Sequence, residues 1–273
     1  MKESIAIKNF IEYWDDWHSE WFKNIKDRPD KIRDWKIPYE KGDNENSICY
    51  YFPEPYWGNP YSDEIVAVFL NLNPGGGGEC QDIKSDNKST SNLYSIYSTS
   101  YLYSKTIEQL SSNLCYNTTN WFDKKRVRWL SKLFSCNSAN YQNKFTVCNI
   151  LCADLIPWHT PTFNSKIEKY VIEHRQQIFD YVIKPITIIS QQATLKGFVF
   201  AKGRATEKIL SKIIGVPIQY KNGKFEINLF NYGGAVIIVF VGGQGMYLPN
   251  PCEKKYQDEN MVKLSVYEIL KNK

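Results

Sequence analysis

The sequence predicts an α/β protein with three layers, in which helices cover both faces of a central, mainly parallel, four-stranded sheet. Four apolar runs of strand length alternate with segments of helical periodicity. Continuous apolar runs of this kind are typical of strands that are buried on both faces. A chain of 273 residues with 42% hydrophobic content is also long enough to bury the core of such a domain.

The N-terminal part is expected to form a helix and an irregular extension. Residues 4–25 carry an apolar stripe at helical spacing, formed by Phe10, Trp14, Trp17 and Trp21. Residues 28–64 are rich in Pro, Gly, Asp and Asn, which favours an irregular path. We therefore expect residues 1–64 to pack as an extension on an α/β domain of residues 65–273, in one structural unit.

The rest of the chain follows the alternating pattern. The expected strands span residues 64–73, 144–155, 197–201 and 234–243, and the expected helices span residues 93–110, 123–134, 166–182, 202–214 and 258–270. Residues 225–230 form either an extra strand or part of a hairpin. Because ligands of open parallel sheets bind beyond the carboxyl ends of the strands, we expect the functional site at these ends.

Composition narrows the classes of function. The net charge of +5 permits a polyanionic partner, although it falls short of a strongly basic domain. No N-terminal signal pattern and no run of eighteen apolar residues occur, so the expectation is a cytoplasmic monomer with no membrane partner. The seven scattered cysteines argue against a disulfide framework. Cys148 and Cys152 are the one close pair, and buried thiols are favoured there over zinc or an iron–sulfur cluster. We expect no metal and no cofactor.

The carboxyl end of each of the four expected strands carries residues that suggest a functional site. The first strand runs into "LNLNPGGGG", and the second is followed by Asp154 and "IPWHTPTF". The third ends in "KGR", which offers cations and backbone amides suited to a phosphate. The fourth runs into "GGQGMYLPNP".

The motif "LNLNPG" resembles the first motif of the uracil-DNA glycosylase superfamily, most closely its mismatch-specific and single-strand-selective branches with G-x-N-P-G. The order of strands and helices over residues 65–250 is similar as well, and the resemblance implies a single α/β/α domain. Two departures stand out. Asn71 replaces the glycine of the first motif, and "GGQGMYLPNP" stands where the family often has His-Pro-Ser, so the histidine that stabilises the departing base has no counterpart.

The resemblance implies that Asn73 is catalytic and holds the attacking water. Asn71, Pro74, Gly75 and Gly76 would then line the base pocket, and Gly75 would leave room for substituents on pyrimidine C5. Asp154 takes the place of the base-reading asparagine, with Asn149 as a competing alignment. An aspartate can accept from the amino group of cytosine and, when protonated, donate to its N3. The alternative reading of Asp154 is a turn or N-cap residue before Pro157.

Further residues are expected around the base. Trp158 and His159 lie at the predicted active edge. Base extrusion from a duplex needs a wedge, for which the resemblance points to the loop with Gln244, Met246, Tyr247 and Leu248. The residues expected to contact DNA phosphates are Lys202, Gly203 and Arg204, with Lys124, Lys125, Arg126 and Arg128 as a second basic patch.

The leading hypothesis is a monofunctional DNA glycosylase, a hydrolase that removes a modified or damaged pyrimidine from single- or double-stranded DNA. A substituted cytosine in foreign DNA would fit, with a role in antiviral defence. The alternatives are a repair enzyme for uracil or mismatched thymine, and a non-catalytic nucleic-acid-binding protein that keeps the fold. "NPGGGG" can also be a plain glycine turn in an unrelated fold. No dinucleotide or P-loop motif follows any strand, which disfavours a nucleotide-dependent enzyme.

Overall fold

The computed structural model describes residues 5–24, 53–60, 64–72, 102–114, 126–135, 145, 149–158, 165–222 and 225–241. The elements within this part of the chain are α1 (Ile5–Asn24), β1 (Tyr56–Trp57), β2 (Ala67–Asn71), α3 (Tyr103–Leu114), α4 (Arg128–Ser135), β3 (Ile150–Asp154), α5 (Ser165–Glu173), α6 (Arg175–Ile178), the π-helical turn η5 (Phe179–Ile183), α7 (Lys184–Ser190), β4 (Phe198–Lys202), α8 (Arg204–Ile213), β5 (Ile218–Asn222), β6 (Phe225–Tyr232) and β7 (Ala235–Phe240).

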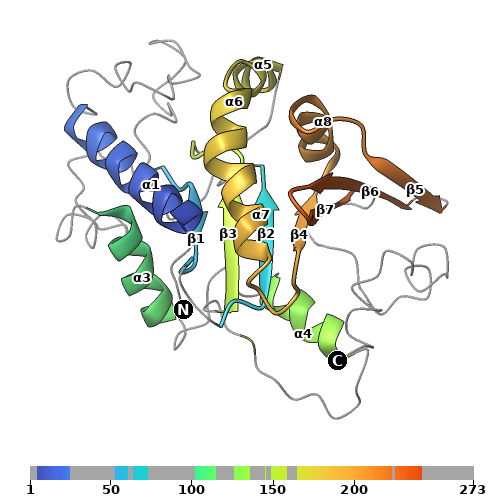
Figure 1. Ribbon diagram of the computed structural model, residues 1–273, viewed down its shortest axis with the longest axis horizontal. Helices are drawn as coiled ribbons and strands as arrows, with labels where there is room; N and C mark the ends of the chain where they lie inside the picture. Colours follow the sequence, from blue (N-terminus) through green and yellow to red (C-terminus); the bar gives the residue numbers. More distant parts are fainter. Residues whose placement is uncertain are drawn as a thin grey trace, which may run out of the picture.

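The strands form one seven-stranded sheet in the order β1-β3-β2-β4-β7-β6-β5. The pairs β3–β2, β2–β4 and β4–β7 are parallel, whereas β1, β6 and β5 join antiparallel at the two sides (Figure 1). The predicted α/β class is confirmed, but the sheet has seven strands and not four. Strand β6 covers residues 225–230, where an extra strand or part of a hairpin was expected, whereas β1 and β5 were not expected. The two-residue β1 lies in the segment 28–64, whose Pro, Gly, Asp and Asn content favoured an irregular path, and β5 is too polar to be recognised as a strand.

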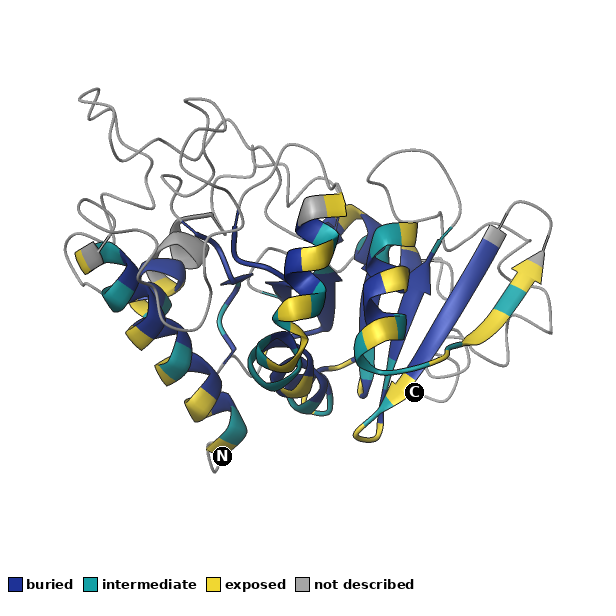
Figure 2. Cartoon of the chain, turned by 90° about the horizontal axis from the view of Figure 1, so that it is seen from above, coloured by how far each residue is buried: buried dark blue, intermediate teal, exposed yellow. Residues whose placement is uncertain are grey.

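Alternating residues of the central strands build two cores, one on each face of the sheet. Val68 and Leu70 of β2 face a core with α1, α7 and α8, while Phe69 faces a second core with α4. Helices therefore lie on both faces, and α7 crosses in front of β2 and β3 in Figure 1. In Figure 2 the helices turn their buried residues towards the sheet and their exposed residues outwards. This is the arrangement that the amphipathic patterns predict.

Helix α1 packs its aromatic stripe into the first core, as the spacing of its tryptophans predicts. Trp14 and Trp21 are completely buried, and the Tyr13 ring stacks on Tyr181 of η5 at 3.4 Å between centroids. His18 lies in the same core, parallel to the Tyr103 ring at 4.2 Å. Burial lowers the pKa of His18 to about 3, so this imidazole is neutral at physiological pH.

The helix expected at residues 166–182 is longer and interrupted. It runs as α5, α6, η5 and α7 to Ser190, and the π-helical turn directly precedes Pro185 at the start of α7. A proline is tolerated in the first turn of a helix, where its missing N–H needs no partner. The π-helical turn thus lets the chain continue past a residue that usually ends a helix.

The remaining expected helices differ mainly at their ends. The described part of the 93–110 helix begins at Tyr103 and continues to Leu114, and the 123–134 helix corresponds to α4 with a π-type turn at 126–127. The expected helix at 258–270 lies outside the described residues. Within the described part, no helix combines the length and the apolar character that crossing a membrane requires.

Candidate functional site

Asn71 and Asp154 lie side by side where the parallel strands β2 and β3 end. They are register partners, and the backbone N–H of Leu155 donates to the Asn71 carbonyl at 3.0 Å just beyond them. Their side chains share the face of Phe69 and Cys152, because alternate residues of a strand point the same way. The structure therefore brings together two of the predicted site residues at the carboxyl edge of the sheet.

The Asp154 carboxyl group is almost completely buried, at 2% exposure. Its Oδ1 atom has no hydrogen-bond partner. Burial, followed by the nearby Glu54 carboxylate, raises the pKa of Asp154 well above its usual value, while Asn71 and Arg126 oppose the shift. A protonated carboxyl group can donate as well as accept a hydrogen bond, which gives this residue two ways to pair with a ligand.

Arg126 belongs to the same site but comes from a different segment of the chain. It stands at the turn before α4, is only 6% exposed, and donates from Nη2 to the Asn71 Oδ1 atom at 2.7 Å. Its guanidinium lies 5.3 Å from the centroid of the Phe69 ring and beside the Cys152 thiol, a weak acceptor. The Nε and Nη1 atoms are buried and have no hydrogen-bond partner.

The three side chains form a polar chain of fixed direction. Because Arg126 donates to the Asn71 oxygen, the Asn71 amide nitrogen is left to face Asp154, whose pKa the Asn71 side chain lowers. Burial lowers the pKa of Arg126 from its usual value, yet a guanidinium keeps its proton under any physiological condition. We name Asn71, Arg126 and Asp154 the polar triad.

Two further residues enclose the triad. The backbone N–H of Asp154 donates to the Pro55 carbonyl at 2.9 Å, which holds the segment with Glu54 against the end of β3. Glu54 accepts from Trp57 Nε1 at 2.5 Å. Tyr103 of α3 donates to the Tyr56 carbonyl at 2.5 Å, and burial raises the pKa of its hydroxyl, to which Glu54 and Asp154 also contribute. The triad, Glu54 and Tyr103 thus come from five separate segments of the chain.

Buried polar atoms without partners are uncommon, since each costs about 1–3 kcal/mol. The triad has such atoms on both sides, two N–H donors on Arg126 and one oxygen on Asp154. Perturbed ionisable groups of this kind cluster at functional sites. An acceptor would satisfy the Arg126 donors, and a donor would satisfy the Asp154 oxygen. No cluster of three or more metal-ligating side chains occurs in the described part of the chain.

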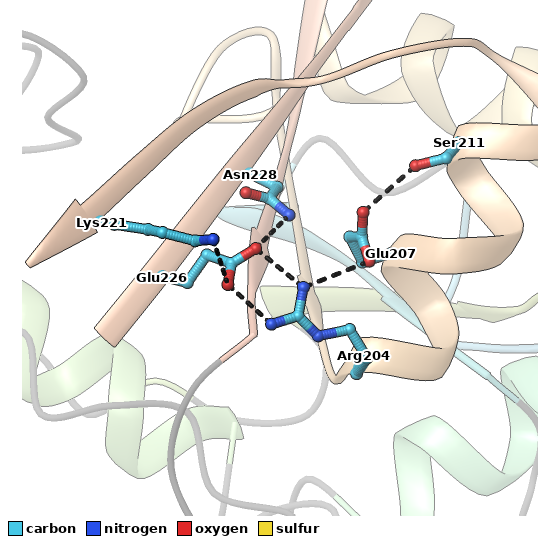
Figure 3. A network of polar contacts seen from close by, with 6 residues as sticks. All are labelled: Arg204, Glu207, Ser211, Lys221, Glu226 and Asn228. Atoms are coloured by element: carbon cyan, nitrogen blue, oxygen red, sulfur yellow. Dashed lines mark hydrogen bonds and ion pairs between the residues drawn. The ribbon is translucent and has the colours of Figure 1, made fainter. Parts of the chain in front are cut away.

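The residues predicted to bind phosphate lie at the end of the neighbouring strand β4. Arg204, the first residue of α8, forms a bidentate ion pair with Glu226 of β6, with hydrogen bonds of 2.8 and 2.6 Å (Figure 3). Glu207, Lys221 and Asn228 complete this network. Gly203 precedes the helix at φ +102°, and Lys202 ends β4 opposite Phe240. The Arg204 guanidinium thus ties α8 to the β5–β6 hairpin.

Two predicted pocket residues are placed elsewhere. Asn149 precedes β3 at its amino end, one strand length from Asp154, and donates to the Glu64 carbonyl at 3.2 Å. It cannot face the same ligand, so Asp154 is the residue at the carboxyl edge. Trp158 is 1% exposed, donates to the Tyr170 hydroxyl at 3.2 Å, and packs against Trp17. It is a core residue because its ring closes the interface with α1.

The other predicted site residues lie outside the described residues. They are Asn73, Pro74, Gly75, Gly76, Lys124, Lys125, His159, Gln244, Met246, Tyr247 and Leu248. Their assigned roles remain predictions.

Sequence reasoning assigned Arg126 to a basic surface patch, which is wrong because the side chain is buried. A signal was available. Arg126 shares helical spacing with Trp129, Leu130 and Leu133, the residues that α4 buries against the sheet. A lone cation on an apolar stripe indicates a buried charge with a specific task. Glu54 and Tyr103 carry no comparable pattern, and only the fold brings them to the site.

Comparisons with protein-family models, with curated proteins and with solved structures return no match for this chain. The resemblance to the uracil-DNA glycosylase superfamily therefore depends on the "LNLNPG" motif and the order of elements alone.

Proposed function

We propose that the protein is a DNA glycosylase that hydrolyses the N-glycosidic bond of a modified or damaged pyrimidine. The observation that carries the proposal is the pairing of Asn71 and Asp154, with an unpartnered buried carboxyl oxygen, at the carboxyl ends of adjacent parallel strands. The "NPG" segment follows Asn71 after a single residue. The four parallel strands β3, β2, β4 and β7 would then be the central sheet of the glycosylase domain.

In this reaction water replaces the base at the anomeric carbon, through a transition state with oxocarbenium character. Asn73 would orient the water, and Asp154 would read the base. The Asp154 oxygen without a partner can accept from an exocyclic amino group, and the protonated carboxyl can donate to ring N3. Both features favour a cytosine-type base. Gly75 would leave space beside pyrimidine C5, so that a substituted cytosine of foreign DNA would be admitted.

The direct test is to incubate the purified protein with single-stranded and duplex oligonucleotides that contain uracil, mismatched thymine or 5-substituted cytosines. Abasic sites are then detected by alkaline cleavage. Release from at least one of them is expected, and Asn73→Ala should abolish release while DNA binding persists. If the parent protein releases none of these bases, the enzyme proposal fails and a binding protein that keeps the fold is favoured.

Asp154→Asn provides a sharper test of base reading. The Asn71 amide nitrogen faces residue 154, so the new carboxamide would turn its oxygen to Asn71 and its NH₂ group to the base. An NH₂ group donates to the 4-oxo group of uracil and repels the 4-amino group of cytosine. The substitution should therefore shift the preference from 4-amino to 4-oxo pyrimidines by roughly tenfold or more. An unchanged ratio of the two rates would contradict the assigned role of Asp154.

A further inference from the structure

Base recognition by Asp154 does not explain why the buried Arg126 guanidinium has N–H donors without a partner. A buried guanidinium normally pairs with a carboxylate or satisfies most of its five N–H donors. Here Nη2 donates to the side-chain oxygen of Asn71, while Nε and Nη1 are buried without a hydrogen-bond partner. The positive charge is therefore held in the interior, beside an aromatic ring, with donors left over.

The surroundings indicate what kind of group these donors would receive. The Glu54 carboxylate lies near Asp154 and would repel a phosphate that entered the same space. A neutral ligand with a carbonyl oxygen meets no such repulsion and can accept from Nε and Nη1. The amide of Asn71 joins Arg126 to Asp154, so the ligand that pairs with Asp154 also comes within reach of the guanidinium.

We infer that Arg126 is a catalytic residue that stabilises the departing pyrimidine by donating to its O2 atom. This inference rests on the proposed glycosylase function. When the bond between C1′ and N1 breaks, both electrons remain on N1, and the negative charge spreads to O2. Water then forms the new bond to C1′, and the proton that it loses is taken up by the released base through solvent. The net reaction consumes one water and yields an abasic sugar and a neutral base.

The charge of Arg126 suits this step. A fixed cation in a site of low dielectric stabilises an anion that develops in the transition state more than it stabilises the neutral ground state. The chain lacks the histidine that the family resemblance implies for this task, and Arg126 would supply the missing stabilisation from a different segment. Asn71 acts as a positioning residue, because it fixes the guanidinium through Nη2.

The test uses the dependence of rate on the leaving base. Uracil and 5-fluorouracil, and cytosine and 5-fluorocytosine, form pairs in which fluorine makes the base anion more stable. Release is measured by single-turnover kinetics for the parent protein, Arg126→Gln, Arg126→Lys and the control Lys132→Met, at an exposed position of α4. Thermal unfolding and DNA binding of every variant are measured in parallel.

Arg126→Gln is expected to lower release by about 100-fold or more, as the loss of one oxyanion donor does. It should affect the unsubstituted bases several-fold more than the fluorinated ones, because they depend more on stabilisation of the anion. Arg126→Lys, which keeps the charge, should recover part of the rate and of the fluorine ratio, and Lys132→Met should match the parent.

Equal losses for both members of each pair would overturn the role of Arg126 and leave the glycosylase proposal standing. Absence of release by the parent protein would overturn both. If Arg126→Gln fails to fold, the fluorine ratio of Arg126→Lys decides: a ratio equal to that of the parent, at a reduced rate, counts against the inference.

Discussion

The side chain of Arg126 is fixed by Asn71, whose Oδ1 atom accepts from Nη2 of the buried guanidinium at 2.7 Å. This hydrogen bond joins the turn before α4 to the last residue of β2. It is the contact on which the geometry of the polar triad depends, because both partners also interact with Asp154.

Asn71→Ala removes the acceptor and leaves a third donor of the buried guanidinium without a partner. We expect a loss of about 1–3 kcal/mol in the free energy of unfolding, measured by urea denaturation. Gln176→Ala is the matched control, since it truncates an exposed amide that bonds Asp180 at 2.8 Å. The control should change stability by less than about 0.5 kcal/mol. Similar effects of the two substitutions would contradict the role of Asn71 as the partner of the buried guanidinium.

Asp154 makes stability depend on pH in a defined direction. Its pKa is raised in the folded state, so above the unfolded value near 3.9 the folded protein binds a proton that the unfolded chain has lost. Stability therefore falls as pH rises from about 4 towards the raised pKa. Asp154→Asn removes this titration and should be more stable than the parent at pH 8, with a smaller difference at pH 4. Urea denaturation at several pH values measures the free energy of unfolding of the parent and of Asp154→Asn. If the two proteins show the same dependence of stability on pH, the raised pKa of Asp154 is contradicted.

Gly58 is required by close approach as well as by its backbone conformation. It adopts φ +98°, and a Cβ atom there would lie 2.3 Å from the Ile150 carbonyl oxygen of β3. Gly58→Ala should therefore cost about 3 kcal/mol or more, because the backbone around β1 must move. Gly215→Ala is the control, since φ is +122° but no atom lies within 4 Å. It should cost only about 1–2 kcal/mol. Equal losses of stability for the two substitutions would show that the backbone around β1 moves to accommodate the new Cβ atom at no extra cost.

The ion pair of Arg204 and Glu226 should couple more strongly than an exposed pair. Glu226 is 8% exposed and receives two hydrogen bonds from Arg204, which holds the pKa of Glu226 below its usual value. A double-mutant cycle with both residues changed to Ala should give about 1–2 kcal/mol of coupling. The same cycle for Lys105 and Glu108, exposed neighbours on α3, should give under about 0.5 kcal/mol. Equal coupling energies for the two pairs would mean that the ion pair of Arg204 and Glu226 is no stronger than an exposed one.

The central strands could be predicted from the sequence because burial on both faces leaves an unbroken apolar run. The runs around Val68, Ile150, Val199 and Ile237 all became parallel strands. The edge strands were harder. β1 has two residues and owes its pairing to Gly58, and β5 alternates polar residues on an open side of the hairpin.

The site was predicted in part, for a reason that lies in topology. Asn71 and Asp154 end recognisable strands, so the rule for parallel sheets identified both. Arg126, Glu54 and Tyr103 come from segments without such a rule, and they meet only through packing. Trp158 was misassigned because an aromatic residue near a strand end is equally suited to a pocket and to a core.

Strand β2 also has a temporal consequence. It lies between β3 and β4, and both neighbours follow it in the chain, at residues 150–154 and 198–202. During synthesis β2 therefore has neither parallel partner until more than 75 further residues have emerged. Closing such long loops slows folding. The apolar strand that carries Asn71 therefore stays unpaired until more than half of the chain has left the ribosome. An unpaired apolar strand is prone to aggregation during that interval.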